Sequence, residues 1–183
     1  MSQTKDLTMI LHRAWQLIEQ SPNDKTAPLR TPVLGTRGDD YNIRMVVLRE
    51  ASSKHRYLRC HTHIQSAKIA HIKKHPAANW LFYEPTLRIQ IRARGPTRLE
   101  VEGILVNRLW QQAHPSMQLA YLDPHPGKSH TKEKLSHMDP RKNFVAIETL
   151  VEHMDILQIS DTSLVRSTFH WDGTCFNGQW VTP

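Results

Sequence analysis

The sequence is poor in cysteine and contains no long apolar run. Its two cysteines, Cys60 and Cys175, lie far apart and do not form a metal-type pair. The apolar runs are only a few residues long, so no segment predicts a membrane-spanning helix. Charged residues interrupt 1–20, which argues against a secretory signal. We therefore expect a cytoplasmic protein with reduced thiols, and 183 residues suffice for one domain covering 1–183.

The sequence also lacks a long block of lysine and arginine, although its formal net charge is +7. The cations are scattered in ones and twos along strand-like segments. A wide nucleic-acid-binding face requires many clustered cations, whereas one buried phosphate requires only a few. The distribution therefore favours a discrete anion pocket over a broad basic surface.

Helices are few in the predicted secondary structure. Apolar residues recur at helical spacing within residues 1–22, which predicts an N-terminal helix. Ser66 is a candidate cap for a helix that runs to about His75. A helical region begins at Asn107 and breaks near His114. Residues 123–142 are polar and rich in proline, and they predict a long loop.

Strands dominate the rest of the chain. Several segments alternate polar and apolar residues, as strands buried on one face do. Gly95-Pro96 is expected to interrupt one of these strands. Strands in antiparallel succession with sparse helices predict a mainly β fold with helical insertions (α+β), a barrel rather than a doubly wound sheet. The predicted strands cover residues 32–36, 41–50, 56–60, 79–83, 87–94, 98–106, 143–149, 154–160, 165–171 and 174–181.

Two arginines bracket the apolar centre of segment 41–50. On an uninterrupted strand Arg44 and Arg49 face opposite sides, so they reach a common anion only where one of them lies at a frayed end. The alternative is that both are solvated ends of the strand.

A second candidate site lies where a strand ends and the next helix begins. Thr62 and Ser66 supply hydroxyl groups, and Lys68 falls in the first turn of the helix. A cation there is unfavourable unless an anion offsets it, and a phosphate would do so. The alternative is an ordinary serine cap beside an exposed lysine. Farther on, Gln90 lies between arginines and is suited to hydrogen bonding the edge of a heterocycle.

Taken in order, these segments resemble the pyridoxamine 5′-phosphate oxidase superfamily. Arg44-Met45-Val46-Val47-Leu48-Arg49 looks like that family's Arg-x-Val-Leu-Lys/Arg strand, and Thr62 to Lys68 looks like its Thr-x-x-x-Ser-x-Lys turn. Residues 76–83 and 90–95 resemble two further family strands. The segment 154–160, Arg166 and the segment 178–183 resemble an oxidase-related FMN-binding subgroup. The resemblance covers about residues 31–183.

The resemblance implies an antiparallel FMN-binding split β-barrel, a homodimer with FMN at the subunit interface, and a flavin-dependent oxidoreductase of unassigned substrate. No residue is assigned as a catalytic acid or base, and no metal is expected. The implied cofactor-binding residues are Arg44, Arg49 and Lys68 at the phosphate, Thr62 and Ser66 beside them, Met45, Val46, Val47 and His61 around the flavin, Gln90 at its polar edge, and Trp180 from the other subunit.

The sequence departs from the family at positions that bear on the substrate. Ala67 stands where the true oxidases have an arginine before the lysine. Ala113 and His114 occupy the region of a substrate-phosphate arginine, and the sequence stops at Pro183 before an Arg-x-His segment. FMN binding is therefore expected, whereas the sequence leaves open whether oxidation of vitamin B6 is retained.

Three rival functions remain open from the residues alone. His61 with His63, or His71 with His75, would suit a metal, but no acidic or cysteine partner accompanies them. Haem binding would use the loop histidines. Nucleic-acid binding would use a basic strand face with an aromatic side chain for stacking. The residues concerned are His125, His130 and His137 for haem, and Arg88, Arg92, Arg94, Tyr83 and Trp80 for nucleic acid.

Overall fold

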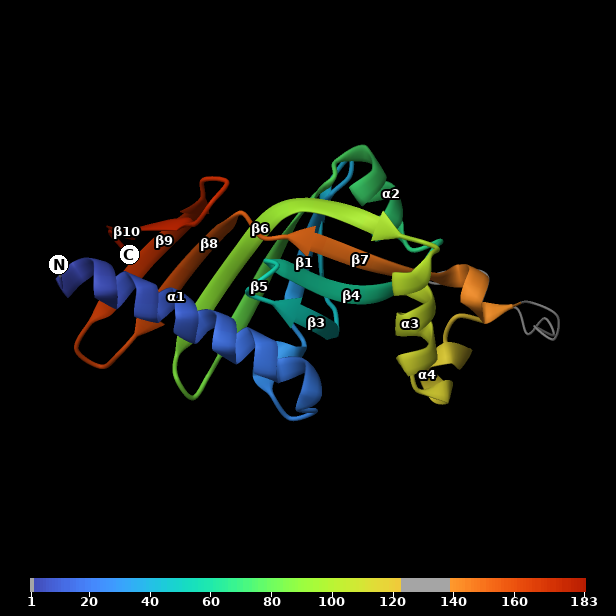
Figure 1. The fold of residues 1–183 in the computed structure, drawn as a ribbon, viewed down its shortest axis with the longest axis horizontal. Coiled ribbons are helices and arrows are strands. Elements are labelled where there is room, and N and C mark those ends of the chain that lie inside the picture. The colour runs from blue at the N-terminus through green and yellow to red at the C-terminus, as the bar shows by residue number, and fades with distance from the viewer. Residues whose placement is uncertain (1, 123–138) are drawn as a thin grey trace.

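The computed structural model describes residues 2–122 and 139–183, and its main element is an antiparallel β-sheet (Figure 1). Its strands are β1 Val33–Arg37, β2 Tyr41–Met45, β3 Leu48–Ser52, β4 Tyr57–His63, β5 Ala77–Glu84, β6 Ile89–Glu100, β7 Phe144–Leu150, β8 His153–Ile159, β9 Leu164–Trp171 and β10 Phe176–Val181. Its helices are α1 Ser2–Gln20, α2 Ala67–Lys74, α3 Ile104–Gln112 and α4 Pro115–Leu119, with short 3-10 turns at Ser21–Asn23, Pro28–Arg30 and Pro140–Asn143.

The long strand β6 joins two parts of the sheet. Its first half pairs with β5 and β8, in the strand order β10-β9-β8-β6-β5-β1-β2. Its second half pairs with β7, which leads through β4 to β3. In the described residues the sheet does not close, because β2, β3 and β10 are edges. The prediction of a mainly antiparallel split-barrel fold is confirmed, in its open form.

The expected interruption at Gly95-Pro96 is wrong. β6 continues through both residues, and the backbone of the β7–β8 connection approaches it there. A Cβ added to Gly95 would lie 1.8 Å from the carbonyl oxygen of Leu150, so only glycine allows this approach. The strand ends at Glu100 rather than Val106, and α3 begins at Ile104 after Gly103, whose φ of +96° suits glycine.

The predicted strand over residues 41–50 is also wrong in one respect. It is two strands, β2 and β3, separated at Val46-Val47. β2 forms the expected hairpin with β1, whereas β3 pairs with β4 in the other part of the sheet. The chain therefore changes pairing partner between the two arginines of this segment.

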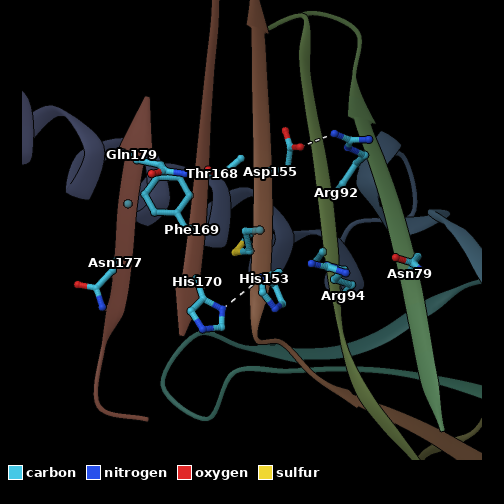
Figure 2. A pocket seen from close by; sticks show the side chains of 13 residues that line it. Asn79, Arg92, Arg94, His153, Asp155, Thr168, Phe169, His170, Asn177 and Gln179 are labelled. Atoms are coloured by element: carbon cyan, nitrogen blue, oxygen red, sulfur yellow. Dashed lines mark hydrogen bonds and ion pairs between the residues drawn. The ribbon is translucent and has the colours of Figure 1, made fainter. Parts of the chain in front are cut away.

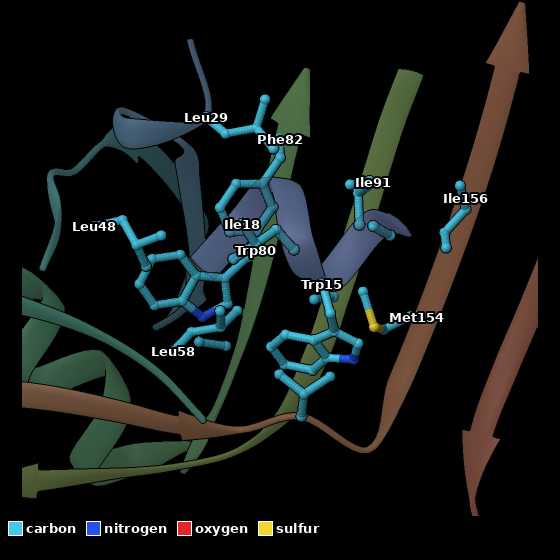
Figure 3. Packing of buried hydrophobic residues seen from close by; sticks show 14 of the residues in the cluster. Trp15, Ile18, Leu29, Leu48, Leu58, Trp80, Phe82, Ile91, Met154 and Ile156 are labelled. Carbon is cyan, nitrogen blue, oxygen red and sulfur yellow. The ribbon is translucent and has the colours of Figure 1, made fainter. Parts of the chain in front are cut away.

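Helix α1 covers one face of the sheet, and the main core lies between them (Figures 1 and 3). Trp15 and Ile18 of α1 are almost fully buried, as their helical spacing predicts. They belong to the same core as Trp80 and Phe82 of β5. Burying each such side chain contributes about 1.5–3 kcal/mol. Trp80 also donates a hydrogen bond from Nε1 to Thr149 Oγ1 at 2.9 Å. Because only 1% of its surface is exposed, it offers no free face on which a base could stack.

A smaller apolar cluster anchors α3 to the end of β7. It combines Val106 and Leu109 with Tyr121, Phe144 and Ala146. The helical region breaks between α3 and α4 near His114, as expected. Most of the predicted loop 123–142 lies outside the described residues. Within the described part of the chain, no helix is both long enough and apolar enough to cross a membrane.

Candidate functional site

Arg44 lies at the end of β2 with its guanidinium held by neutral acceptors. Its NH1 nitrogen donates to the carbonyl oxygen of Leu34 at 3.1 Å and to Thr36 Oγ1 at 2.7 Å. NH2 donates to Asn42 Oδ1 at 2.5 Å. These contacts fix the direction of the side chain without neutralising its charge. None of these three partners is among the residues predicted from the sequence, although the spacing of Asn42 and Arg44 is a signal, because residues i and i+2 share a strand face.

A β-bulge redirects Arg49. In the β3–β4 ladder Leu48 pairs with Cys60 and Glu50 pairs with Arg59, so Arg49 is an extra residue with no opposite partner. Bulges of this kind re-aim a side chain. The strict alternation that would place the two arginines on opposite faces of one strand therefore does not apply.

Lys68 lies in the first turn of α2, which begins directly after Ser66. Its Nζ donates to Thr62 Oγ1 at 3.0 Å and to Ser66 Oγ at 2.5 Å. Ser66 occupies the N-cap position as predicted, but its hydroxyl makes no capping hydrogen bond to the helix. The two hydroxyl groups expected beside the lysine therefore do lie beside it.

The charges of all three cations act on one buried thiol, that of Cys60. Burial raises the pKa of the Cys60 thiol to about 12, and the charges of Lys68, Arg49 and Arg44 each lower it. Burial lowers the pKa of Lys68 itself, and the charge of Arg44 lowers it further. We call Arg44, Arg49 and Lys68 the cation cluster.

No carboxylate of a described residue forms an ion pair with the cation cluster. Burial lowers the pKa of both arginines, and the described groups that raise it are the Cys60 thiol and, for Arg49, the Tyr121 phenol, with no carboxylate among them. All three residues are half-buried rather than directed into bulk solvent. Partly desolvated cations without counter-charges fit a multiply charged oxyanion such as a phosphate, which accepts several charge-assisted hydrogen bonds.

The remaining predicted site residues are spread over the sheet. Met45 and Gln90 lie on the face away from α1, with Met45 exposed and Gln90 half-buried. Val46 and Val47 form the half-buried break between β2 and β3. Trp180 lies on edge strand β10, paired with buried Ser167, at the opposite end of the strand order from β2. A single chain thus does not bring Gln90 or Trp180 to the cation cluster.

His61 lines a cavity of about 320 Å³ next to Arg49. Burial lowers its pKa to about 4, and the charge of Arg49 acts in the same direction, so the ring is neutral at pH 7. Its Nε2 is buried and has no hydrogen-bond partner among the described residues. Ala113 and His114 also line this cavity, in the region where the family resemblance expects a substrate-phosphate arginine.

A larger cavity of about 580 Å³ opens on the face of the sheet away from α1 (Figure 2). Arg92 pairs there with Asp155, and the Nδ1 atoms of His153 and His170 lie 3.3 Å apart on neighbouring strands. This region could not be predicted from the sequence, because matching His153 with His170 requires the β8–β9 register. None of the cation cluster lines it.

The geometry of the described residues gives little support to the rival functions of metal binding and nucleic-acid binding. The part of the chain that is described contains no group of three or more potential metal ligands. Arg88 lies in the turn before β6, with φ of +49°, and pairs with Asp161, so it does not belong to a basic strand face. The three loop histidines proposed for haem lie outside the described residues.

Comparison with known proteins agrees with this fold. Residues 9–100 match the family described as pyridoxamine 5′-phosphate oxidase, FMN-binding domain. A pyridoxamine 5′-phosphate oxidase-related FMN-binding protein from Nostoc punctiforme PCC 73102 is 22% identical with a TM-score of 0.78, covering 93% of this chain and 96% of its own. PhzG from Burkholderia lata 383, in complex with tetrahydrophenazine-1-carboxylic acid, is 18% identical with a TM-score of 0.77, covering 96% and 92%. The comparison with curated proteins found no match.

Proposed function

Because this chain belongs to the family of the pyridoxamine 5′-phosphate oxidase FMN-binding domain, we propose that it is an FMN-binding flavoprotein that acts as a flavin-dependent oxidoreductase. The observation that carries the proposal is the cation cluster, whose half-buried side chains lack a carboxylate partner among the described residues. Family membership alone would not require this chain to have kept a phosphate site. The three cations supply the charge that such a site needs.

In this proposal the cation cluster holds the flavin phosphate. Arg44 and Arg49 supply forked donors, and Lys68 supplies a point charge. Thr62 and Ser66 keep the ammonium group of Lys68 in place through the hydrogen bonds that they accept. The backbone at the Val46-Val47 break would face the flavin ring, with Met45 and His61 nearby.

We further propose that the active form is a homodimer. Gln90 lies on a sheet face that carries several exposed apolar side chains, a feature typical of protein–protein contact. A second copy covering this face would allow Gln90 to contact the polar edge of the flavin and Trp180 to approach from the partner. The exposed apolar residues are Tyr41, Ile43, Met45, Leu81 and Tyr83.

FMN, when bound, supplies hydride or electron transfer at its ring. The protein would bind and orient the substrate, and the cavity beside Arg49 is the candidate place. His61 is neutral there and presents an unpartnered nitrogen to a hydrogen-bond donor. Ala113 and His114 in place of an arginine support a substrate other than pyridoxamine 5′-phosphate.

The test begins with the absorbance spectrum of the purified protein and mass spectrometry of the ligand released on denaturation. We expect a flavin spectrum and the mass of FMN. The double variant Arg44→Ala, Lys68→Ala removes two charge-assisted contacts and is expected to weaken FMN binding by a factor on the order of a thousand.

Arg88→Ala is the matched control, because it removes an exposed arginine far from the cation cluster in the strand order. It should retain FMN as the unmodified protein does. Full FMN occupancy in the double variant would overturn the assignment of the phosphate site.

A further inference from the structure

A chain of hydrogen bonds connects helix α2 to Arg44. The guanidinium of Arg44 donates to Thr36 Oγ1 at 2.7 Å, and Thr36 Oγ1 lies 3.1 Å from Nδ1 of His71. Thr36 is buried, with 4% of its surface exposed, and His71 is half-buried between α2 and β1. Neither residue belongs to the motifs that carry the family resemblance.

The donor is fixed in the first of these bonds, whereas in the second it depends on which nitrogen of His71 carries the proton. Thr36 accepts from Arg44, so its own hydroxyl proton is free to be donated to His71. Nδ1 accepts that bond when the imidazole proton is on Nε2, and Nδ1 donates to Thr36 when it carries the proton itself. The Thr36 oxygen is thereby turned towards Arg44, and a buried hydroxyl without such a partner would lose this orientation.

Helix α2 thus helps to position two cations, Lys68 and Arg44. Lys68 and His71 are three residues apart, so they lie on one face of α2. Gly38 provides the space for the imidazole ring: a Cβ added there would lie 2.6 Å from Cδ2 of His71. The helix presents Lys68 directly and orients Arg44 through His71 and Thr36.

We propose that His71 and Thr36 are positioning residues that hold Arg44 in the geometry required by the flavin phosphate. This inference rests on the proposed function and assigns to it two residues outside the cation cluster. Neither residue touches the phosphate. Their contribution is preorganisation, which reduces the freedom that Arg44 must lose when the ligand binds.

The test compares the affinities for FMN and for riboflavin, which lacks the phosphate, by quenching of flavin fluorescence. Thr36→Val removes the hydroxyl and keeps the shape, so FMN affinity should fall about tenfold. His71→Ala should weaken FMN binding roughly threefold to tenfold. Riboflavin affinity should stay unchanged in both variants, because only the phosphate contact is disturbed.

Conservative variants supply the matched controls. Thr36→Ser retains the hydroxyl, and His71→Asn retains a polar group near the position of Nδ1, so both should bind FMN nearly as the unmodified protein does. Gly38→Ala changes neither His71 nor Thr36 but displaces the imidazole ring of His71, so it should reproduce the loss expected for His71→Ala.

The outcomes separate the two proposals. Equal loss of FMN and riboflavin affinity would show a merely structural role and overturn the inference, as would unchanged FMN affinity in Thr36→Val and His71→Ala. If the unmodified protein does not prefer FMN to riboflavin, the proposed phosphate site itself fails, and the positioning role fails with it.

Discussion

Two groups of charged side chains in this protein use arginine in opposite ways. The cation cluster has no carboxylate partner among the described residues. The second group crosses the other part of the sheet: Arg59 pairs with Glu50 at 2.5 Å and with Glu148, and Arg98 pairs with Glu148 at 2.7 Å. We call Glu50, Arg59, Glu148 and Arg98 the charge ladder.

Strand register explains the difference. In the charge ladder, Glu50, Arg59, Glu148 and Arg98 follow one another directly across β3, β4, β7 and β6, so each charge meets its opposite. Arg49 is the neighbour of Glu50 in sequence, but the bulge removes it from this ladder. Charges that complete a ladder stabilise the fold, whereas charges kept apart from it remain available to a ligand.

The largest effect on stability is expected in the charge ladder. Glu148→Gln leaves Arg59 buried without one of its counter-charges, which should lower the free energy of unfolding by about 3 kcal/mol. Urea unfolding followed by circular dichroism measures this change. FMN affinity of the folded protein should not change. Stability within about 0.5 kcal/mol of the unmodified protein would contradict the structural role of the ladder.

In the cation cluster, by contrast, we expect a substitution to weaken FMN binding without lowering the stability of the ligand-free protein. Lys68→Gln removes a partly buried cation that Arg44 repels, so the ligand-free protein should be as stable as before or slightly more stable. FMN affinity should fall by about thirtyfold, since one charge-assisted contact is lost. Urea unfolding and flavin titration of the same preparation measure both effects. Loss of stability without loss of FMN affinity would show that the two regions do not differ as described.

His61 borders both regions and reports on them through pH. Its pKa is lowered to about 4 by burial, then by Arg49, with smaller contributions from Arg108 and Arg59. The unfolded chain binds a proton below about pH 6.5 that the folded chain does not, so stability falls as the pH drops from 6.5 towards 4.

His61→Asn should remove part of this acid sensitivity, on the order of 2 kcal/mol between pH 7 and pH 4.5. Urea midpoints at the two pH values measure it for the variant and the unmodified protein. If both proteins lose the same amount of stability between pH 7 and pH 4.5, His61 is not held neutral.

The smallest effect is expected at an exposed pair outside both regions. Arg88 pairs with Asp161 in solvent, and Arg88→Ala should change the free energy of unfolding by less than about 0.5 kcal/mol. The same urea series measures it. A change comparable to that of Glu148→Gln would mean that burial does not distinguish the ladder from a surface pair.

Much of the fold could be predicted from the sequence, because alternation marks strands buried on one face. The strands at residues 144–150, 153–159, 164–171 and 176–181 match their predicted ranges closely. The errors in the predicted strand boundaries arise where contacts between distant segments determine the backbone conformation. Neither glycine nor proline marks the break at Val46-Val47, and Gly95 serves a close approach of Leu150 rather than a turn.

The candidate site likewise has one part that could be predicted from the sequence and one part that could not. The local unit from Thr62 to Lys68 could be predicted, because one strand end and one helix start contain its contacts. The direction of Arg49 depends on the bulge opposite β4, which no local pattern reveals. Thr36 and His71 escaped prediction because their contact joins β1 to α2, segments that are 35 residues apart.

The most direct measurement is a parallel titration of the ligand-free protein with FMN and with riboflavin, at matched ionic strength. The two ligands share the ring system and differ in the phosphate, so their affinity ratio isolates the contribution of the cation cluster. We predict that FMN binds at least about a hundredfold more tightly, as expected for several charge-assisted hydrogen bonds. Equal affinities would contradict the assignment of Arg44, Arg49 and Lys68 as a phosphate site.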